Sequence, residues 1–572
     1  MTAHRLIPAI AGLVALVGLA TTPALSQQTA DLVLRGGKIV TMDDANPQAQ
    51  ALAVVGDRIV AVGSDARISG YVGSGTRVID LNGRLAIPGF IEGHGHFMGI
   101  GGAKLILDLM TPTSWEEIVQ MVADAAEEAE PGEWIEGRGW HQEKWNQVPD
   151  PLVEGLPVHD GLSAVSPDNP VVLRHASGHA SFVNAKAMEL AGITADTPDP
   201  DGGEIVRDVA GEPTGVLRET AQRLTGGVRA RAEAERSDAE RAAERREMAR
   251  LAFEDLLSKG ITSFHDAGSG FGTIDFFKDL ADRGQMPVRL YVMVSASHDE
   301  MEEKLAEYRM IGYANDHLTV RSIKQVVDGA LGSHGAWLLE AYADLPRSSG
   351  LATNPPDRIE RAAQIAIRNG YQVNTHAIGD RGNREVLDLY ERTFVANPDR
   401  SDLRWRIEHS QHLAPSDIPR FAQLGVIASM QAIHGCSDGP WVIQRLGETR
   451  AAQGAYVWQD LLKSGAVVTN GTDAPVEDVN PMASFHCSVT RLVQDGSSFF
   501  PNNAMTREQA LRSYTLSNAY AAFEEDIKGS LTVGKLADIV VMSTDIMTAP
   551  PEEVAGARVL YTIVGGEVLF ER

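Results

Sequence analysis

Two histidines separated by a single glycine stand at the end of an apolar run in this sequence. Residues 88–97 read PGFIEGHGHF, with His94 and His96 on either side of Gly95. On a β-strand, side chains two positions apart point to the same face, so the two imidazoles would converge at the end of the strand. Neutral imidazole binds zinc and neighbouring divalent metals well. The spacing indicates a metal site, with two surface histidines after a strand as the alternative.

Ionisable side chains recur near the ends of later segments that also have strand-like sequences. A single histidine in such a place is usually a hydrogen-bonded structural residue. Burying many ionisable groups together costs free energy unless a metal or charged partners compensate, so the ordered set predicts one metal-dependent catalytic site. The strand ends carry His94 and His96, His265 and Asp266, Lys324 and Asp328, His376, His409, and Asp473. The set that predicts the site is His94, His96, Lys324, His376, His409 and Asp473, and Asp266 is expected to be a structural hydrogen-bonding residue.

The segments that carry these groups alternate with helical patterns, which predicts an α/β fold. Repeated βα units of this number favour a distorted TIM (β/α)8 barrel, which gathers catalytic groups at the carboxyl ends of its strands. A doubly wound sheet is the alternative, and the barrel is favoured because polar residues end nearly every strand. The predicted strands are 85–94, 260–267, 287–296, 319–330, 371–377, 403–409, 426–434 and 466–475.

The rest of the chain divides around this barrel, which is assigned residues 87–97 and 231–524. Residues 27–86 and 525–572 show short strands and turn dipeptides, which predict one small β-sandwich built from both chain ends. Residues 98–230 are too long for one loop and predict an inserted α+β domain between the first two barrel strands. Residues 231–258 predict one long helix with a solvated, charged face.

Residues 1–26 predict a secretory signal rather than part of the fold. Arg5 precedes the apolar residues 6–20, and a small-x-small site follows at 24–26. We expect cleavage near Ser26–Gln27 and export to the periplasm or the medium. The apolar stretch is too short for a comfortable membrane span, so no stable anchor is expected. The two cysteines, Cys436 and Cys487, could form one disulfide.

Composition excludes some functions. The chain has 572 residues, 43% of them hydrophobic and 22% charged, which is an ordinary globular composition. A formal net charge of −26 argues against binding nucleic acid through a broad basic surface. The expected partner is a small-molecule, amide-like substrate, and a homo-oligomer is compatible with the sequence.

The ordered motifs resemble the amidohydrolase superfamily, in the family 3 branch that is similar to N-substituted formamide deformylases. The resemblance covers residues 31–572 and includes the insert, through GEWIEGRGW and RHASGHASFVNAKAMELAGI. The barrel and sandwich motifs are PGFIEGHGH, GITSFHDAG, IKQVVDGALGSHGA, NTHAIGDRGN, RIEHSQH, ASMQAIH, TNGTDAPVEDVNP and GSLTVGKLADIVVM.

The resemblance implies a divalent metal cofactor, expected to be zinc, as one or two ions. His94 and His96 would hold a first metal, and His376 and His409 a second metal or the rest of a shared site. Lys324 would ligate as a carbamate formed with carbon dioxide, because a protonated lysine repels a cation. The alternative is a charged Lys324 paired with Asp328.

The resemblance also assigns Asp473 as metal ligand and general base. A carboxylate beside metal-activated water can accept its proton and deliver it to a leaving nitrogen. His434 would polarise the substrate carbonyl, and His179 and Trp140 of the insert would close over the substrate.

Two residues depart from the family pattern. Glu92 stands where the superfamily usually has Asp, and we expect it to orient a histidine. His141 follows the Gly-Trp pair where an acid or amide is usual, which leaves the substrate open.

The implied enzyme is a metal-dependent hydrolase of non-peptide carbon–nitrogen bonds. Hydrolysis of esters or lactones, or deamination, on the same site is the alternative. A catalytically dead periplasmic binding protein is the alternative of a different class, and it predicts loss of the base or of several ligands.

Overall fold

The computed structural model describes Met1, residues 28–147 and residues 149–572. The predicted signal segment, apart from Met1, lies outside the described residues. No helix in the described part of the chain combines the length and the apolar character needed to cross a membrane.

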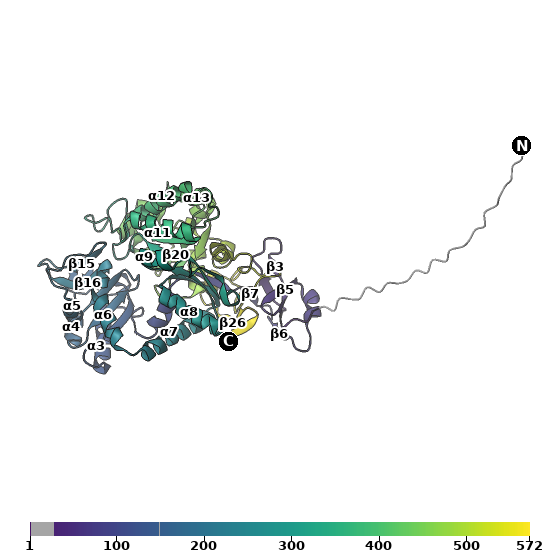
Figure 1. Ribbon diagram of the computed structural model, residues 1–572, viewed down its shortest axis with the longest axis horizontal. Helices are drawn as coiled ribbons and strands as arrows, with labels where there is room; N and C mark the ends of the chain where they lie inside the picture. Colours follow the sequence, from purple (N-terminus) through teal and green to yellow (C-terminus); the bar gives the residue numbers. More distant parts are fainter. Residues whose placement is uncertain (2–27, 148) are drawn as a thin grey trace.

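Eight parallel strands form the centre of the molecule and confirm the predicted barrel. They follow one another in chain order, and the last strand lies beside the first without a hydrogen-bonded ladder, so the barrel is nearly closed. Helices on the outside connect the strands (Figure 1). The strands are β8 (Phe90–Gly95), β17 (Ile261–Ser269), β18 (Arg289–Val294), β20 (Leu318–Val326), β21 (Gln372–Ala377), β22 (Arg406–His409), β23 (Ile427–Met430) and β24 (Val468–Asn470).

The helices that follow these strands cover the barrel wall. Apolar side chains at helical spacing, such as Ile359, Ala362 and Ala366, are buried against the strands. The principal helices are α8 (Phe271–Asp282), α9 (His298–Lys304), α11 (Pro356–Asn369), α12 (Asp380–Ala396), α13 (Ile418–Leu424), α17 (Trp458–Ser464), α18 (Pro481–Thr490), α19 (Arg507–Ser513) and α20 (Leu516–Ala521).

The predicted strand at 85–94 is two strands in the structure. β7 (Leu85–Pro88) pairs with strands of the terminal sandwich, and only β8 belongs to the barrel. Gly89 lies between them, and a Cβ there would be 2.2 Å from Thr262 Oγ1. The chain therefore passes between the two units where only a glycine fits.

The two chain ends form the sheets beside the barrel, on the side opposite the insert (Figure 1). One sheet has the order β5-β4-β1-β6 and the other β27-β26-β25-β7-β2-β3. Their strands are β1 (Leu32–Arg35), β2 (Lys38–Val40), β3 (Gln48–Ala49), β4 (Ala51–Val55), β5 (Arg58–Gly63), β6 (Arg77–Asp80), β25 (Ile539–Met542), β26 (Val559–Val564) and β27 (Glu567–Glu571).

The insert is a mixed sheet with helices α3 (Trp115–Glu128), α4 (Asp160–Val165) and α5 (Ala185–Ala191). Its strand order is β15-β16-β14-β13-β10-β9. Two strands that contribute residues to the site are β10 (Ile135–Trp140) and β13 (Val171–His175), which are parallel neighbours. The others are β9 (Leu107–Asp108), β14 (Ala180–Val183), β15 (Gly203–Arg207) and β16 (Pro213–Glu219).

The prediction of one helix over 231–258 is wrong. Two helices, α6 (Arg223–Glu235) and α7 (Asp238–Ser258), meet at Arg236 and Ser237. Ser237 has extended backbone and forms a reciprocal capping box with Glu240. The cap starts a new helix, which runs from the insert to the barrel (Figure 1).

Candidate metal centre

His94 and His96 lie at the end of β8 and face the loop that follows β24. Asp473 in that loop donates its backbone N–H to the His94 carbonyl at 2.8 Å, and His96 donates to Ala474 at 2.6 Å. Asp473 has a positive φ of 58°, a conformation that aspartate tolerates better than most residues. Its Oδ1 lies 3.2 Å from His96 Nε2 and 3.6 Å from His94 Nε2.

The other predicted ligands close around this group. Lys324 lies near the end of β20, and its Nζ is 3.1 Å from His94 Nε2. The rings of His376 on β21 and His409 on β22 have centroids 4.4 Å apart, and those of His94 and His409 are 4.7 Å apart. The structure thus brings the six predicted metal-binding residues to one end of the barrel.

Lys324 does not pair with Asp328. The Asp328 carboxylate instead accepts backbone hydrogen bonds from Trp337, Ile378 and Gly379. It organises the loops after β20 and β21, and its Oδ1 lies 3.6 Å from His376 Nε2. The alternative of a Lys324–Asp328 ion pair does not hold.

His265 and Asp266 have structural contacts. His265 Nδ1 lies 3.1 Å from the guanidinium of Arg406 inside the barrel. Asp266 accepts hydrogen bonds from the Phe97 backbone and the Ser269 hydroxyl. Neither residue belongs to the group around Asp473.

Two side chains that sequence reasoning missed orient the imidazoles. Glu408 Oε2 lies 2.5 Å from His94 Nδ1, which directs the Nε2 lone pair of His94 toward Asp473 and Lys324. The amide oxygen of Gln431 accepts from His409 Nδ1 at 2.7 Å, so His409 Nε2 is the nitrogen left to bind a cation. Glu408 directly precedes His409 in the sequence, which is the one signal that could have found it.

Glu92 does not orient a histidine, contrary to expectation. One oxygen of its carboxyl accepts the backbone N–H of Thr472, and the other is buried without a hydrogen-bond partner among the described residues. Burial raises the pKa of Glu92 to about 8. The side chain supports the loop that carries Asp473.

The electrostatics of the group suit a cation. Burial lowers the pKa of His94, His376 and His409, which favours neutral imidazoles. Burial alone would raise the pKa of Asp473, but the close imidazoles of His96, His94 and His409 hold it well below its ordinary value.

The donor set itself fits a divalent metal. Ligand atoms of His94, His96 and Asp473 all lie within 4.8 Å of one another. Within the described ranges, His376 Nε2 and Asp473 Oδ1 are buried and lack a hydrogen-bond partner. Buried polar atoms rarely stay unpaired, and imidazole nitrogen with carboxylate oxygen is a donor set that zinc takes.

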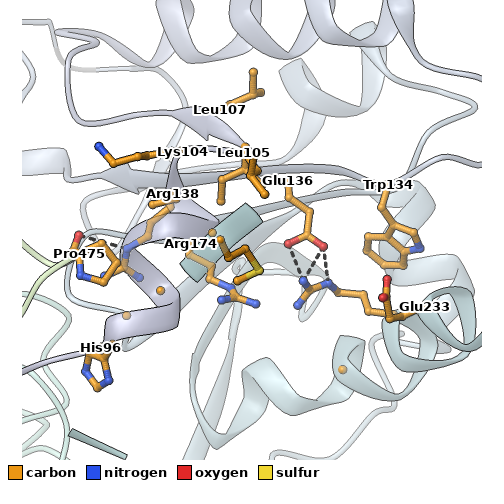
Figure 2. A pocket seen from close by; sticks show the side chains of 18 of the residues that line it. His96, Lys104, Leu105, Leu107, Trp134, Glu136, Arg138, Arg174, Glu233 and Pro475 are labelled. Carbon is orange, nitrogen blue, oxygen red and sulfur yellow. Dashed lines mark hydrogen bonds and ion pairs between the residues drawn. The ribbon is translucent and has the colours of Figure 1, made fainter. Parts of the chain in front are cut away.

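A cleft of about 1840 Å³ between the insert and the barrel opens onto these residues. His96, Lys324, His376, His409 and Asp473 line its inner end, and Figure 2 shows His96 and some of the residues that line the rest. A smaller recess of about 50 Å³ adjoins it.

His434 lines the small recess, on helix α14 (Ala432–Ser437) rather than at the end of a strand. Gln411 donates its amide N–H to His434 Nδ1 at 3.0 Å, so Nε2 carries the ring proton. That nitrogen is buried and has no partner in the described part of the chain. The Cys436–Cys487 disulfide joins α14 to α18.

The two insert residues expected over the site are placed differently. His179 lines both cavities, its Nδ1 lies 2.7 Å from Glu219 Oε2, and its ring centroid is 5.0 Å from that of His376. Trp140 lies instead in the insert core, where its indole N–H donates to the Leu173 carbonyl. It lines neither of these two cavities.

A β-bulge explains the misplacement of Trp140. Glu136 and Arg138 alternate along β10 toward the cleft, and a regular strand would send Trp140 the same way. The pairing register with β13 shifts between Arg138 and Trp140, at Gly139 with a φ of 112°. The extra residue turns Trp140 to the core face. The next residue, His141, lines the small recess.

Comparison with known proteins agrees with this geometry. The pattern of the amidohydrolase family matches residues 77–570. The chain belongs to the amidohydrolase family. An amidohydrolase with a TIM-type barrel was predicted from the motifs, and both the enzyme class and the fold are confirmed.

Relatives within the amidohydrolase family extend over nearly the whole chain. Protein LONG AFTER FAR-RED 3 of Arabidopsis thaliana is 35% identical over 95% of this chain and 92% of its own. N-substituted formamide deformylase of Arthrobacter pascens is 28% identical over 95% of this chain and 99% of its own. The crystal structure of an uncharacterized metal-dependent hydrolase from Pyrococcus horikoshii is 25% identical, with a TM-score of 0.71 over 91% of this chain and 99% of that one.

Glu408→Gln should weaken metal binding, because a neutral amide raises the basicity of His94 less than a carboxylate does. Loss of such a partner typically costs about 10- to 100-fold in affinity. The test is titration of the metal-free protein with Zn²⁺ against a competing chelator. Glu92→Gln is the matched control: it alters another buried glutamate that contacts backbone, and its affinity should stay near wild type. Equal affinities in all three proteins would contradict the assigned role of Glu408.

Proposed function

We propose that this amidohydrolase cleaves an amide-like, non-peptide carbon–nitrogen bond with water, using Asp473 as general base. The observation that carries the proposal is the position of the Asp473 carboxylate, against His94 and His96 at the inner end of a deep cleft. The relative named N-substituted formamide deformylase supports the choice of bond.

His94, His96, His376, His409, Lys324 and Asp473 would hold one or two divalent metal ions, with zinc proposed from the nitrogen and carboxylate donors. When bound, such an ion acidifies water and polarises a carbonyl oxygen.

The residues of the chain then divide the remaining work. Asp473 accepts a proton from the attacking water and passes it to the leaving nitrogen. Its low pKa keeps it ionised and ready to accept. His434 presents its Nε2 proton to the recess and can donate to the carbonyl oxygen as negative charge develops there. His179, held by Glu219, closes the insert side of the site.

Lys324 is proposed to act as a carbamate. Burial lowers its pKa, which favours the neutral amine that reacts with carbon dioxide, and no ion pair within 4 Å occupies the ammonium among the described residues. Nζ lies 3.1 Å from His94 Nε2. A protonated lysine at this position would repel a bound cation, whereas a carbamate on Nζ would offer it oxygen ligands.

Ester or lactone hydrolysis and deamination could use the same groups, and a panel of amide, ester and imide substrates separates them. A dead binding protein predicts missing ligands or a missing base. All six predicted metal ligands, with Asp473 among them, are present and adjacent, which favours the enzyme.

Asp473→Asn should lower kcat by about 100- to 10,000-fold, the usual cost of losing a general base. Hydrolysis of N-acylated amines is measured together with metal content, which should stay near that of the wild type. Asp478→Asn, in the same loop but exposed and paired with Lys259, is the control and should keep its turnover. Near-normal turnover of Asp473→Asn would refute the assignment.

Protein incubated with Zn²⁺ and ¹³C-bicarbonate should show a carbamate resonance by NMR that Lys324→Gln lacks. Spectra of the wild type without that signal, at full metal loading, would exclude the carbamate.

We also propose that the chain is exported after removal of its first 26 residues. The disulfide between its only two cysteines is in keeping with an oxidising compartment. Sequencing of the mature protein from the periplasm or medium should begin at or near Gln27. A mature protein that begins at Met1 would contradict the proposed cleavage.

A further inference from the structure

Two arginines occupy paired positions on neighbouring strands of the insert. Arg138 on β10 is in register with Arg174 on the parallel strand β13. Side chains in register on adjacent strands share a face of the sheet, and both arginines line the cleft that leads to Asp473. In Figure 2, Arg174 lies between Arg138 and Glu136, with His96 at one end of this row.

The nearby carboxylate does not neutralise this pair. Glu136 points into the same cleft but is bound by the guanidinium of Arg229 through both of its oxygens. Arg138 donates to the carbonyls of Pro475 and Ala176, at 3.2 Å and 3.0 Å. Like charges on paired positions destabilise a sheet unless an opposite charge compensates.

Arg174 is the unusual member of the row. Its side chain is exposed to the cleft, and across the ranges that the structure describes it forms no ion pair within 4 Å and no hydrogen bond. Burial among the cleft walls and the charge of Arg229 lower its pKa. Burial lowers the pKa of Arg138 to about 10. A guanidinium in this setting has five donors and no acceptor opposite them.

Acidic residues gather at the other end of the cleft. Glu233 lies beside Trp134, away from His96 (Figure 2), and Glu233 and Glu244 both pair with Arg236. The positive charge is therefore concentrated between His96 and Glu136. This local positive charge stands out in a chain whose formal net charge is −26, and a patch of one sign attracts ligands of the other.

We propose that Arg174, with Arg138 beside it, binds an anionic end of the substrate while the scissile bond lies at Asp473. This rests on the proposed function and narrows it to acylated amines that carry a carboxylate. A carboxylate matches the planar fork of a guanidinium and can be held by two parallel hydrogen bonds. The cleft, at about 1840 Å³, has room for such an extended substrate.

Arg138 connects the two ends of this arrangement. Its hydrogen bond to Pro475 attaches it to the loop that carries Asp473, two residues earlier. An anion bound by Arg174 would thus be positioned along the same wall as the general base. Arg138 acts as a positioning residue, and Arg174 makes the direct contact.

The test compares N-formyl-ω-aminoalkanoates of increasing chain length with matched N-formylalkylamines. The wild type should prefer the anionic member of a pair at the chain length that spans the cleft. Arg174→Gln should lower kcat/KM for that substrate about 10- to 100-fold, the worth of charge-assisted hydrogen bonds, mainly through KM. The neutral partner should change less than about twofold. Lys104→Gln is the control, because Lys104 lines the same cleft but pairs with Asp255 at 3.1 Å.

Titration calorimetry with hexanoate supplies a readout that needs no turnover. Binding to the wild type that is lost in Arg174→Gln and kept in Lys104→Gln supports the anion site, even if no amide is hydrolysed and the proposed function fails. The anion site is overturned if both substrate classes are hydrolysed without preference, if kcat/KM is equal in the wild type and Arg174→Gln, and if hexanoate binding does not depend on Arg174. The proposed function would stand in that case.

Discussion

The site depends on how the first and last barrel strands meet. β24 and β8 share no ladder, and the barrel is closed instead by the backbone hydrogen bonds from Asp473 to His94 and from His96 to Ala474. Asn518 adds a bridge, since its amide donates to the carbonyls of Ile91 and Asn470. Glycines permit the approach: a Cβ at Gly93 would lie 2.5 Å from the Asn470 carbonyl oxygen. The same bonds that close the barrel therefore hold Asp473 against His94 and His96.

Near the junction of β24 and β8, two histidines have opposite hydrogen-bonding states because different ends of a glutamine amide contact them. The rings of His409 and His434 are nearly parallel, at 12° with centroids 6.5 Å apart. Gln431 accepts from His409 Nδ1 and leaves its Nε2 a lone pair that can bind a cation. Gln411 donates to His434 Nδ1 and leaves its Nε2 a proton that can be donated. Which end of the glutamine amide faces the imidazole therefore decides whether the free ring nitrogen can bind a cation or can donate a hydrogen bond.

Sequence patterns predicted the barrel and its strand-end groups because both follow from local rules, namely strand alternation and the common edge of parallel strands. Glu408 and Gln431 were not predicted because each contacts a histidine ring, of His94 and His409 respectively, that is distant in the sequence. The fold brings these side chains together, and sequence spacing does not reveal it. Trp140 was misplaced by a bulge at Gly139 that alternation alone does not reveal. The break between α6 and α7 was readable, since Ser237 and Glu240 have the spacing of a capping box.

The bulge at Gly139 also separates two functions of the insert. Before it, β10 directs Glu136 and Arg138 into the cleft; after it, Trp140 anchors the core and His141 reaches the recess. A regular strand would have placed an indole on the cleft face beside Arg138. By removing the indole, the bulge leaves polar, charged surface along the route to Asp473. Under the proposed function, the barrel would supply the reacting groups for amide-like bonds. The face of the insert that β10 and β13 present would select among substrates.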